Sequence, residues 1–397
     1  MLNLDIIQNL IALNDAQPVR VNPARCLNAR NKARKCEKCL ACPTDAISLA
    51  GGARVELDTG RCVECGLCAA VCPSHAFTPN GSSDDAILDA VAEYANIEFV
   101  CKRATETRAP NVERVMTAAC LARLSSDLLI AAAAEHSSVW LNDSLCAECP
   151  IGERTHPQIV TLIDTAKHLL AVWNREQTIK PYTGEVLASP RSLTRAGTSG
   201  TELSRREMFS FFRDNVGRAA GMVIAASLGN ANVAKPQAAT EPQPLERALA
   251  KLGRPPGEYV ADARFATIEV ATSCTACRVC AIMCPTRAIE YREAGGYFVL
   301  AFHARACLGA ECGLCQMACR VNAVRLMPGA TGDALESREE QVLRAGALTI
   351  CGKCQVPFAT EPGEINCPLC RAAESKYKTL LRDILKKESN DSPNREE

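Results

Sequence analysis

The sequence predicts an α+β protein built from several small domains, on three observations. The chain has 397 residues, and at roughly 150 residues per domain this length corresponds to two or three domains. It contains 24 cysteines but only 2 Trp, 6 Tyr and 9 Phe, too few large side chains to fill that many ordinary cores. The cysteines fall into six groups of four, with none left over. We therefore expect cysteine-bound metal to organise much of the fold.

Charge and hydropathy exclude several classes of protein. Lys and Arg total 45, as do Asp and Glu, so the net charge indicates neither a nucleic-acid partner nor an anionic membrane surface. Leu2 to Leu13 has the spacing of an amphipathic helix, not of a secretory signal peptide. The longest apolar stretch, Ala219 to Gly229, has eleven residues, whereas a membrane-spanning helix needs about 20. We expect a cytoplasmic protein without a transmembrane segment.

Two of the six cysteine groups have the same spacing. They are Cys62-x2-Cys65-x2-Cys68-x3-Cys72-Pro73 and Cys274-x2-Cys277-x2-Cys280-x3-Cys284-Pro285. This is the full bacterial ferredoxin motif, in which three close thiolates bind one [4Fe-4S] cluster and the fourth binds the neighbouring cluster. Such a motif needs a second one beside it, so we expect the motifs to work in pairs. So tight a spacing also argues against disulfides as the first interpretation.

Each full motif has an irregular partner nearby. Cys36-x2-Cys39-x2-Cys42-Pro43 has its remaining cysteine, Cys26, nine residues upstream, where two would be usual. The other partner, Cys307-x4-Cys312-x2-Cys315-x3-Cys319, has Arg320 in place of the proline. Pro43 and Pro285 are both followed by x-x-Ala-Ile, which links the irregular motifs to the full ones. The four groups are therefore interpreted as two pairs.

These segments resemble two-cluster bacterial ferredoxins, and the chain resembles a polyferredoxin of the kind that serves formate dehydrogenases or hydrogenases. The resemblance implies two ferredoxin-like 2[4Fe-4S] domains, residues 1–80 and 263–330, with four [4Fe-4S] clusters. The first pair of ligand sets that it implies is Cys26, Cys36, Cys39 and Cys72, and Cys62, Cys65, Cys68 and Cys42. The second pair is Cys274, Cys277, Cys280 and Cys319, and Cys307, Cys312, Cys315 and Cys284.

Residues 81–176 predict a small α/β domain with a parallel sheet. Asp84 or Asp85 can cap a first helix, and Ser125, Ser126 and Asp127 open a second one. Strands cover Ile97 to Val100, Val112 to Thr117 and Ser138 to Leu141. A third helix has Thr155 and Gln158 as a capping box. Parallel strands end at one edge of the sheet, so Cys101, Cys120, Cys146 and Cys149 should converge there. A fifth iron-sulfur cluster is favoured at this site, over zinc or unligated thiols.

Residues 177–262 are interpreted as a linker, because Pro, Gly, Ser, Thr and Ala dominate on both sides of an amphipathic helix, 203–228. Within that helix, Ser204 to Phe209 resembles a twin-arginine export motif, although it is internal to the chain. The simpler interpretation is a helix that docks on another domain or on a partner. The docking helix is favoured over an export role.

Residues 331–397 predict a zinc-ribbon-like module followed by a charged tail. Cys351-x2-Cys354-x12-Cys367-x2-Cys370 places two pairs of thiolates on adjacent hairpins, which suits a tetrahedral zinc ion. Rubredoxin iron is the alternative, but Gln355 and Arg371 stand where a rubredoxin usually has glycine, so zinc is favoured. A helix over Lys376 to Lys387 and a disordered end should follow.

The motifs predict a function in electron transfer. The sequence has no G-x-G-x-x-G after a strand, no P-loop and no isolated nucleophilic thiol, so no substrate site stands out. We expect a non-catalytic subunit that relays single electrons between redox partner proteins, such as formate dehydrogenase or hydrogenase subunits. An iron-sulfur sensor or a maturation factor for a metalloenzyme is the alternative. An enzyme acting at the middle site would need an open coordination position, and four cysteines leave none.

Overall fold

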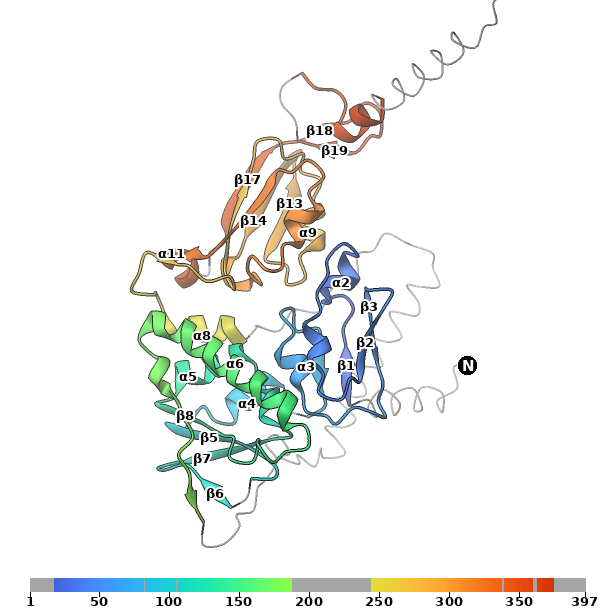
Figure 1. Ribbon diagram of the computed structural model, residues 1–397. Helices are drawn as coiled ribbons and strands as arrows, with labels where there is room; N and C mark the ends of the chain where they lie inside the picture. The colour runs from blue at the N-terminus through green and yellow to red at the C-terminus, as the bar shows by residue number, and fades with distance from the viewer. Residues whose placement is uncertain are drawn as a thin grey trace, which may run out of the picture. The chain divides into compact units, whose positions relative to one another are not determined.

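A computed structural model describes residues 18–81, 83–104, 106–187, 244–337, 339–359 and 363–374 (Figure 1). The chain forms two compact units, one with residues 1–22 and 37–252 and one with residues 23–36 and 253–397. The short segment 23–36 therefore belongs to the carboxyl-terminal unit. The helices expected near the amino terminus, over 203–228 and over 376–387, lie outside the described residues, as do the twin-arginine-like motif and the charged tail.

The first unit contains a small ferredoxin-like module around Cys39, Cys42 and the second cysteine group. Its outer strands, β1 and β4, pair with each other in antiparallel fashion, and β2 and β3 form a hairpin between them. In chain order the elements are β1 Val19–Val21, η1 Lys38–Ala41, β2 Ile47–Ala50, β3 Arg54–Leu57, α3 Leu67–Ala70 and β4 Phe77–Pro79.

The second unit repeats this order of elements around the next two cysteine groups. Strands β12 and β15 pair in antiparallel fashion, and a longer hairpin, β13 with β14, lies between two short helices. The elements are β12 Ala266–Val270, α9 Val279–Met283, β13 Ile289–Ala294, β14 Tyr297–Phe302, η5 Ala304–Ala306, α10 Leu314–Ala318 and β15 Val324–Pro328. Phe298 and Phe302, on the hairpin, are buried in this module's core.

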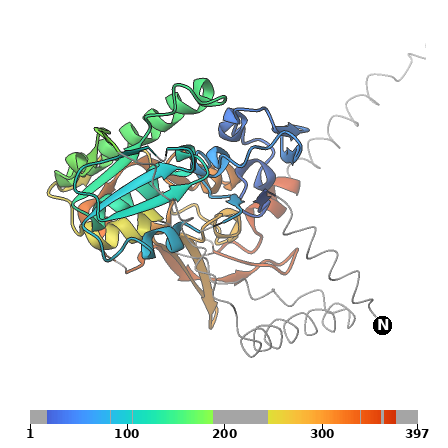
Figure 2. The same cartoon turned by 90° about the horizontal axis from the view of Figure 1, so that it is seen from below.

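A four-stranded parallel sheet forms the centre of the α/β part of the first unit. Its strand order is β7-β5-β8-β9, and its strands are β5 Asn96–Cys101, β7 Arg114–Ala118, β8 Ser138–Asn142 and β9 Ile179–Lys180. The parallel strands predicted near residues 97, 112 and 138 are confirmed. Figure 2 shows the strands side by side, with helix α6 Gly152–Leu170 (green) along the sheet.

Two of the predicted helix starts in this part are wrong. Helix α4 Asp84–Asp89 is capped by the side chain of Ser83, which accepts a hydrogen bond from the backbone N–H of Ala86, and not by Asp84 or Asp85. Thr155 does not cap α6, because the helix begins earlier, at Gly152, and Thr155 is buried with its hydroxyl donating to the carbonyl of Ile151. Helix α5 Ser126–Glu135 begins after Ser125, as predicted.

Part of the segment interpreted as a linker is ordered in the first unit. Helix α8 Pro244–Leu252 buries Leu245, Ala248 and Leu249 and packs on α5. Its Arg247 pairs with Glu135 at 2.9 Å and with Asp89 at 2.7 Å. The proline and alanine content led to the prediction of a linker, although these residues form an amphipathic helix whose apolar side packs on α5. The shorter elements of this unit are β6 Thr107–Arg108, η2 Leu121–Arg123, η3 Ala171–Trp173, η4 Glu176–Thr178 and β10 Glu185–Val186.

Short elements complete the second unit. Strand β17 Gln341–Ala347 extends the β13-β14 hairpin to three strands, and β11 pairs with β16. The remaining elements are α2 Leu27–Arg30, β11 Tyr259–Val260, β16 Ala330–Thr331, α11 Gly332–Glu336, β18 Thr349–Ile350 and β19 Pro357–Phe358. Among the described residues, every helix is too short or too polar to cross a bilayer.

One glycine of the second unit leaves no room for a side chain. Gly309 has a φ of +80°, and a Cβ atom there would lie 2.1 Å from the carbonyl oxygen of Ala263. Gly295, in the β13-β14 turn, has a φ of +59° but open space around it. The conformation alone costs about 1–2 kcal/mol for a residue with a Cβ, so we expect Gly309→Ala to destabilise the protein well beyond Gly295→Ala. Anaerobic thermal unfolding measures both; equal shifts of the midpoint would contradict the clash.

Candidate metal centres

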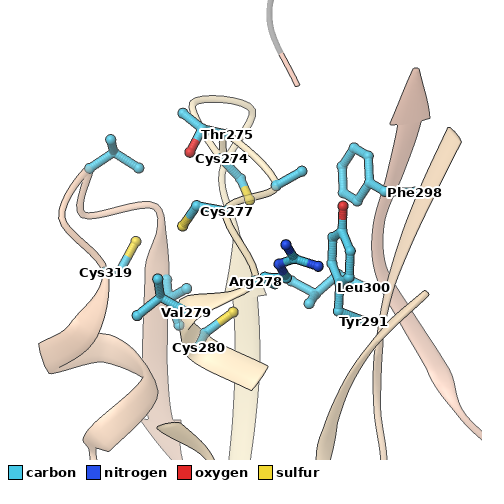
Figure 3. A pocket seen from close by; sticks show the side chains of 13 residues that line it. Cys274, Thr275, Cys277, Arg278, Val279, Cys280, Tyr291, Phe298, Leu300 and Cys319 are labelled. Carbon is cyan, nitrogen blue, oxygen red and sulfur yellow. The ribbon is translucent and has the colours of Figure 1, made fainter. Parts of the chain in front are cut away.

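Four cysteines of the second unit line one cavity. Cys274 and Cys277 come from the loop that leads into α9, Cys280 lies in the first turn of α9, and Cys319 follows the end of α10. Tyr291, Phe298 and Leu300 form part of the cavity wall (Figure 3). Cys319 thus lines the cavity of the preceding motif, and not that of its own motif.

In a second cavity of the same unit, the last cysteine of the first motif lies with the cysteines of the second motif. Cys307, Cys312 and Cys315 line it together with Cys284, the last cysteine of the preceding motif. The remaining wall of this cavity includes Ile268, Phe302 and Leu314. The structure therefore brings together both sets of four thiols that the resemblance implied for this unit.

A repeated backbone turn follows the last cysteine of each motif. The third residue after that cysteine, namely Asp45, His75, Arg287 or Asn322, has a left-handed φ between +48° and +61°. The next residue is a buried alanine in all four turns. This turn directs the alanine N–H at the cysteine, with N to Sγ distances of 3.3 Å for Ala76 to Cys72 and 3.2 Å for Ala323 to Cys319. Such N–H groups stabilise a metal-bound thiolate.

Three of the four cysteine loops share a second backbone feature. Each has two left-handed residues between its cysteines: Glu64 and Gly66, Ala276 and Arg278, and Gly309 and Gly313. These conformations wrap the chain tightly around the space between the thiols. The loop of Cys36, Cys39 and Cys42 instead forms the 3-10 turn η1, in agreement with its irregular spacing.

The first unit gathers Cys42 with Cys62, Cys65 and Cys68. Burial, and after it the charges of Cys65, Cys42 and Cys62, raise the pKa of the Cys68 thiol to about 12. Burial likewise raises the pKa of Cys65 to about 11. With pKa values of about 11 and 12, the buried thiols of Cys65 and Cys68 would bind protons at neutral pH unless a cationic centre offset their charge. This donor set therefore fits a metal cluster.

The remaining predicted set is divided between the two units. Cys39 and Cys72 lie in the first unit, and Cys26 and Cys36 lie in the second. The buried Asn28 holds the Cys36 backbone with two hydrogen bonds of 2.7 Å, one to its carbonyl and one from its N–H. Arg30 donates to the carbonyl oxygens of Met283 at 3.0 Å and Cys284 at 3.3 Å, contacts that sequence analysis did not anticipate. This ligand set stays a prediction.

The four middle cysteines lie at the carboxyl edge of the parallel sheet. Cys101 ends β5, Cys120 follows β7, and Cys146 and Cys149 occupy the loop between β8 and α6. Burial raises the pKa of Cys146 to about 12, and the charges of Cys120, Cys101 and Cys149 are further causes. Gly152 is required beside them, because a Cβ atom there would lie 1.9 Å from the Cys146 carbonyl oxygen.

The carboxyl-terminal cysteines form a tighter site than the others. The sulfur atoms of Cys351, Cys354, Cys367 and Cys370 lie within 4.8 Å of one another, and those of Cys354 and Cys367 are 3.8 Å apart. A tetrahedral ion with metal-sulfur bonds of about 2.3 Å requires sulfur atoms about 3.8 Å apart. Backbone N–H groups of Cys354 and Cys367 lower the pKa of Cys351 to about 6. Gln355, the residue after Cys354, has a left-handed φ of +59°, at a position where a rubredoxin usually has glycine. The site fits a single metal ion.

Glu290, His303 and Glu340 form another close group that sequence analysis missed, because the three residues come from separate elements. Arg292 lies against two of them, with an ion pair to Glu340 and a 3.6 Å pair to Glu290. Its guanidinium already compensates their charge. We assign no metal to this group.

Comparison with protein families agrees with the geometry of the ferredoxin-like modules. The model of the 4Fe-4S dicluster domain matches residues 273–323, and the model of the 4Fe-4S binding domain matches residues 55–78. The chain is an iron-sulfur protein. Its 4Fe-4S domains and cysteine clusters indicate iron-sulfur electron transfer. A comparison with curated proteins gives no match.

Proposed function

We propose that the protein is a relay that passes single electrons between redox partner proteins of an oxidoreductase system, without a substrate of its own. The observation that supports this function best is the exchange of Cys284 and Cys319 between two adjoining thiol-lined cavities. An exchanged ligand covalently ties neighbouring centres together, which serves transfer from one centre to the next. A switch needs only one labile, exposed centre.

The chain's own residues hold and tune the centres. Four [4Fe-4S] clusters, when bound, supply one-electron redox chemistry. The thiolates of the four ferredoxin-type sets would bind them, and the N–H groups of Ala76 and Ala323 would stabilise negative charge on Cys72 and Cys319. Burial by residues such as Phe298 and Phe302 keeps water from the second unit's sites. Zinc at Cys351, Cys354, Cys367 and Cys370 would have a structural role, since zinc undergoes no redox change.

The partner system belongs to the same proposal. We propose cytoplasmic partners of the formate dehydrogenase or hydrogenase type, because the paired ferredoxin motifs resemble polyferredoxins that serve such enzymes. Co-purification from the native cell, followed by identification of the bound subunits, tests this choice. Partners that include neither a formate dehydrogenase nor a hydrogenase subunit would contradict it.

An anaerobic redox titration tests the relay itself. We expect purified protein to take up at least four electrons per chain, about one for each four-iron cluster, and to release them on reoxidation without loss of iron. Iron and sulfide analysis before and after the cycle is the control. Breakdown of the clusters after one cycle, together with their delivery to an apoprotein, would instead favour the sensor or maturation alternative.

A further inference from the structure

Two contacts inside the first unit join the ferredoxin-like module to the α/β part, and both connect cysteine loops. The first is between Gly66, which follows Cys65, and Arg123, at the end of the turn that begins at Cys120. A Cβ atom on Gly66 would lie 2.9 Å from the Cβ and 3.2 Å from the Cα of Arg123. The glycine thus allows the two backbones to touch. The 2.7 Å ion pair of Arg123 with Asp84 holds its side chain in place.

The second contact is made by Arg154, in the first turn of α6, close after Cys149. Its guanidinium donates two hydrogen bonds to the Asp45 carboxylate, at 2.7 and 2.9 Å, and one of 2.9 Å to the carbonyl oxygen of Pro43. Pro43 directly follows Cys42. A planar guanidinium that binds a carboxylate at two points fixes orientation as well as distance.

The two contacts therefore connect the same two groups of thiols at two places. Cys65 and Cys42 belong to one group, and Cys120 and Cys149 belong to the other. Each contact places a cysteine loop of one group against a cysteine loop of the other.

The spacing of the middle thiols argues against a single ion. Among the described residues, the cysteines whose sulfur atoms all lie within 4.8 Å of one another are those of the carboxyl-terminal site. Cys101, Cys120, Cys146 and Cys149 are farther apart, as are the ferredoxin-type sets. Wider spacing suits thiolates that bind separate iron atoms of a cluster, whereas zinc requires the tighter tetrahedron.

We propose that Cys101, Cys120, Cys146 and Cys149 hold an iron-sulfur cluster, and that the Gly66–Arg123 and Asp45–Arg154 contacts position it for direct electron exchange with the centre of Cys42, Cys62, Cys65 and Cys68. This inference rests on the proposed relay function. One electron leaves the reduced centre and enters the oxidised one, with no bond formed or broken and no proton transferred. Gly66, Arg123 and Arg154 are positioning residues in this exchange.

The site itself is tested with Cys146→Ser in the full chain. We expect the variant to lose about two to four irons per chain while the ferredoxin-type modules keep about 16. In dithionite-reduced protein, one ferredoxin-type signal should lose the magnetic interaction that comes from the middle centre, while the interaction within each ferredoxin-type pair stays. Loss of zinc, or of no metal, would overturn the site. Loss of iron with every remaining signal unchanged would overturn the coupling. Absence of the 16 irons from the wild type would instead contradict the relay proposal.

The positioning role is tested with Arg154→Gln, and Arg54→Gln is the matched control. Arg54 is another arginine of the first unit, and it is paired with Glu56 at 3.1 Å on strand β3, where both side chains are exposed. We expect R154Q to keep its full iron content but to lose part of the magnetic interaction, and R54Q to keep both. Equal interaction in R154Q and wild type, with full iron in both, would overturn the positioning role of Arg154.

Discussion

Cys284→Ala should empty the metal site of Cys307, Cys312 and Cys315 and leave the site of its own motif filled. The reason is that Cys284 lines the second cavity, although Cys280 lines the first. We expect a loss of about four irons per chain. Alkylation of the native protein followed by mass spectrometry identifies which thiols have become accessible, and these should be Cys307, Cys312 and Cys315.

Cys319→Ala provides the mirror-image control. Cys319 is only four residues from Cys315 in the sequence, yet it lines the cavity of Cys274, Cys277 and Cys280. Those three thiols should become reactive in this variant, while Cys312 and Cys315 stay protected. If each variant instead exposed the cysteines of its own motif, the exchange of ligands between motifs would be wrong, and the strongest support for the relay would be lost.

The cysteine spacing predicted much of the metal chemistry because it reflects local geometry. Three thiolates with two residues between neighbours can reach one cluster only if the loop wraps around it. The left-handed residues Glu64, Gly66, Ala276 and Arg278 give the two loops this curvature. The parallel sheet was predictable for a similar reason. Its strands are short apolar runs that each end at or near a cysteine, and the structure confirms β5, β7 and β8.

Contacts between distant segments could not be read from the sequence. Arg154 and Asp45 are 109 residues apart, and each belongs to a polar stretch that would be equally satisfied by water. Helix α8 was hidden in a proline-rich and alanine-rich segment because its helical character depends on α5, against which it packs. Gly66 carries no sequence signal for its contact with Arg123, because glycine suits any tight cysteine loop.

Removal of iron should unfold the ferredoxin-like module of the second unit and spare the parallel sheet of the first. The module's buried cluster contains Phe298, Leu300 and Phe302, but it also includes Cys280 and Cys315, so the metal-binding loops are part of its core. Structural metal sites with thiolate ligands contribute about 10–16 kcal/mol to folding when zinc is the metal. A whole domain is typically stable by only about 5–15 kcal/mol, so losing such sites should exceed what the remaining core supplies.

The parallel sheet has a core that does not depend on metal. Ile97, Phe99, Leu128 and Val139 are all at most 1% exposed, and they pack between β5, β8 and α5. Amide hydrogen exchange after anaerobic iron chelation distinguishes unfolding of the module from retention of the sheet.

The amides that pair β12 with β15 should exchange at nearly the unfolded rate, because their cross-strand hydrogen bonds are held by loops that have lost their ligand. The amides of β5 should remain protected, since both neighbouring strands stay paired to it. Unchanged protection of β12 would mean that hydrophobic burial alone holds the module together, and rapid exchange in β5 would mean that the middle site is as essential to its sheet as the clusters are to theirs.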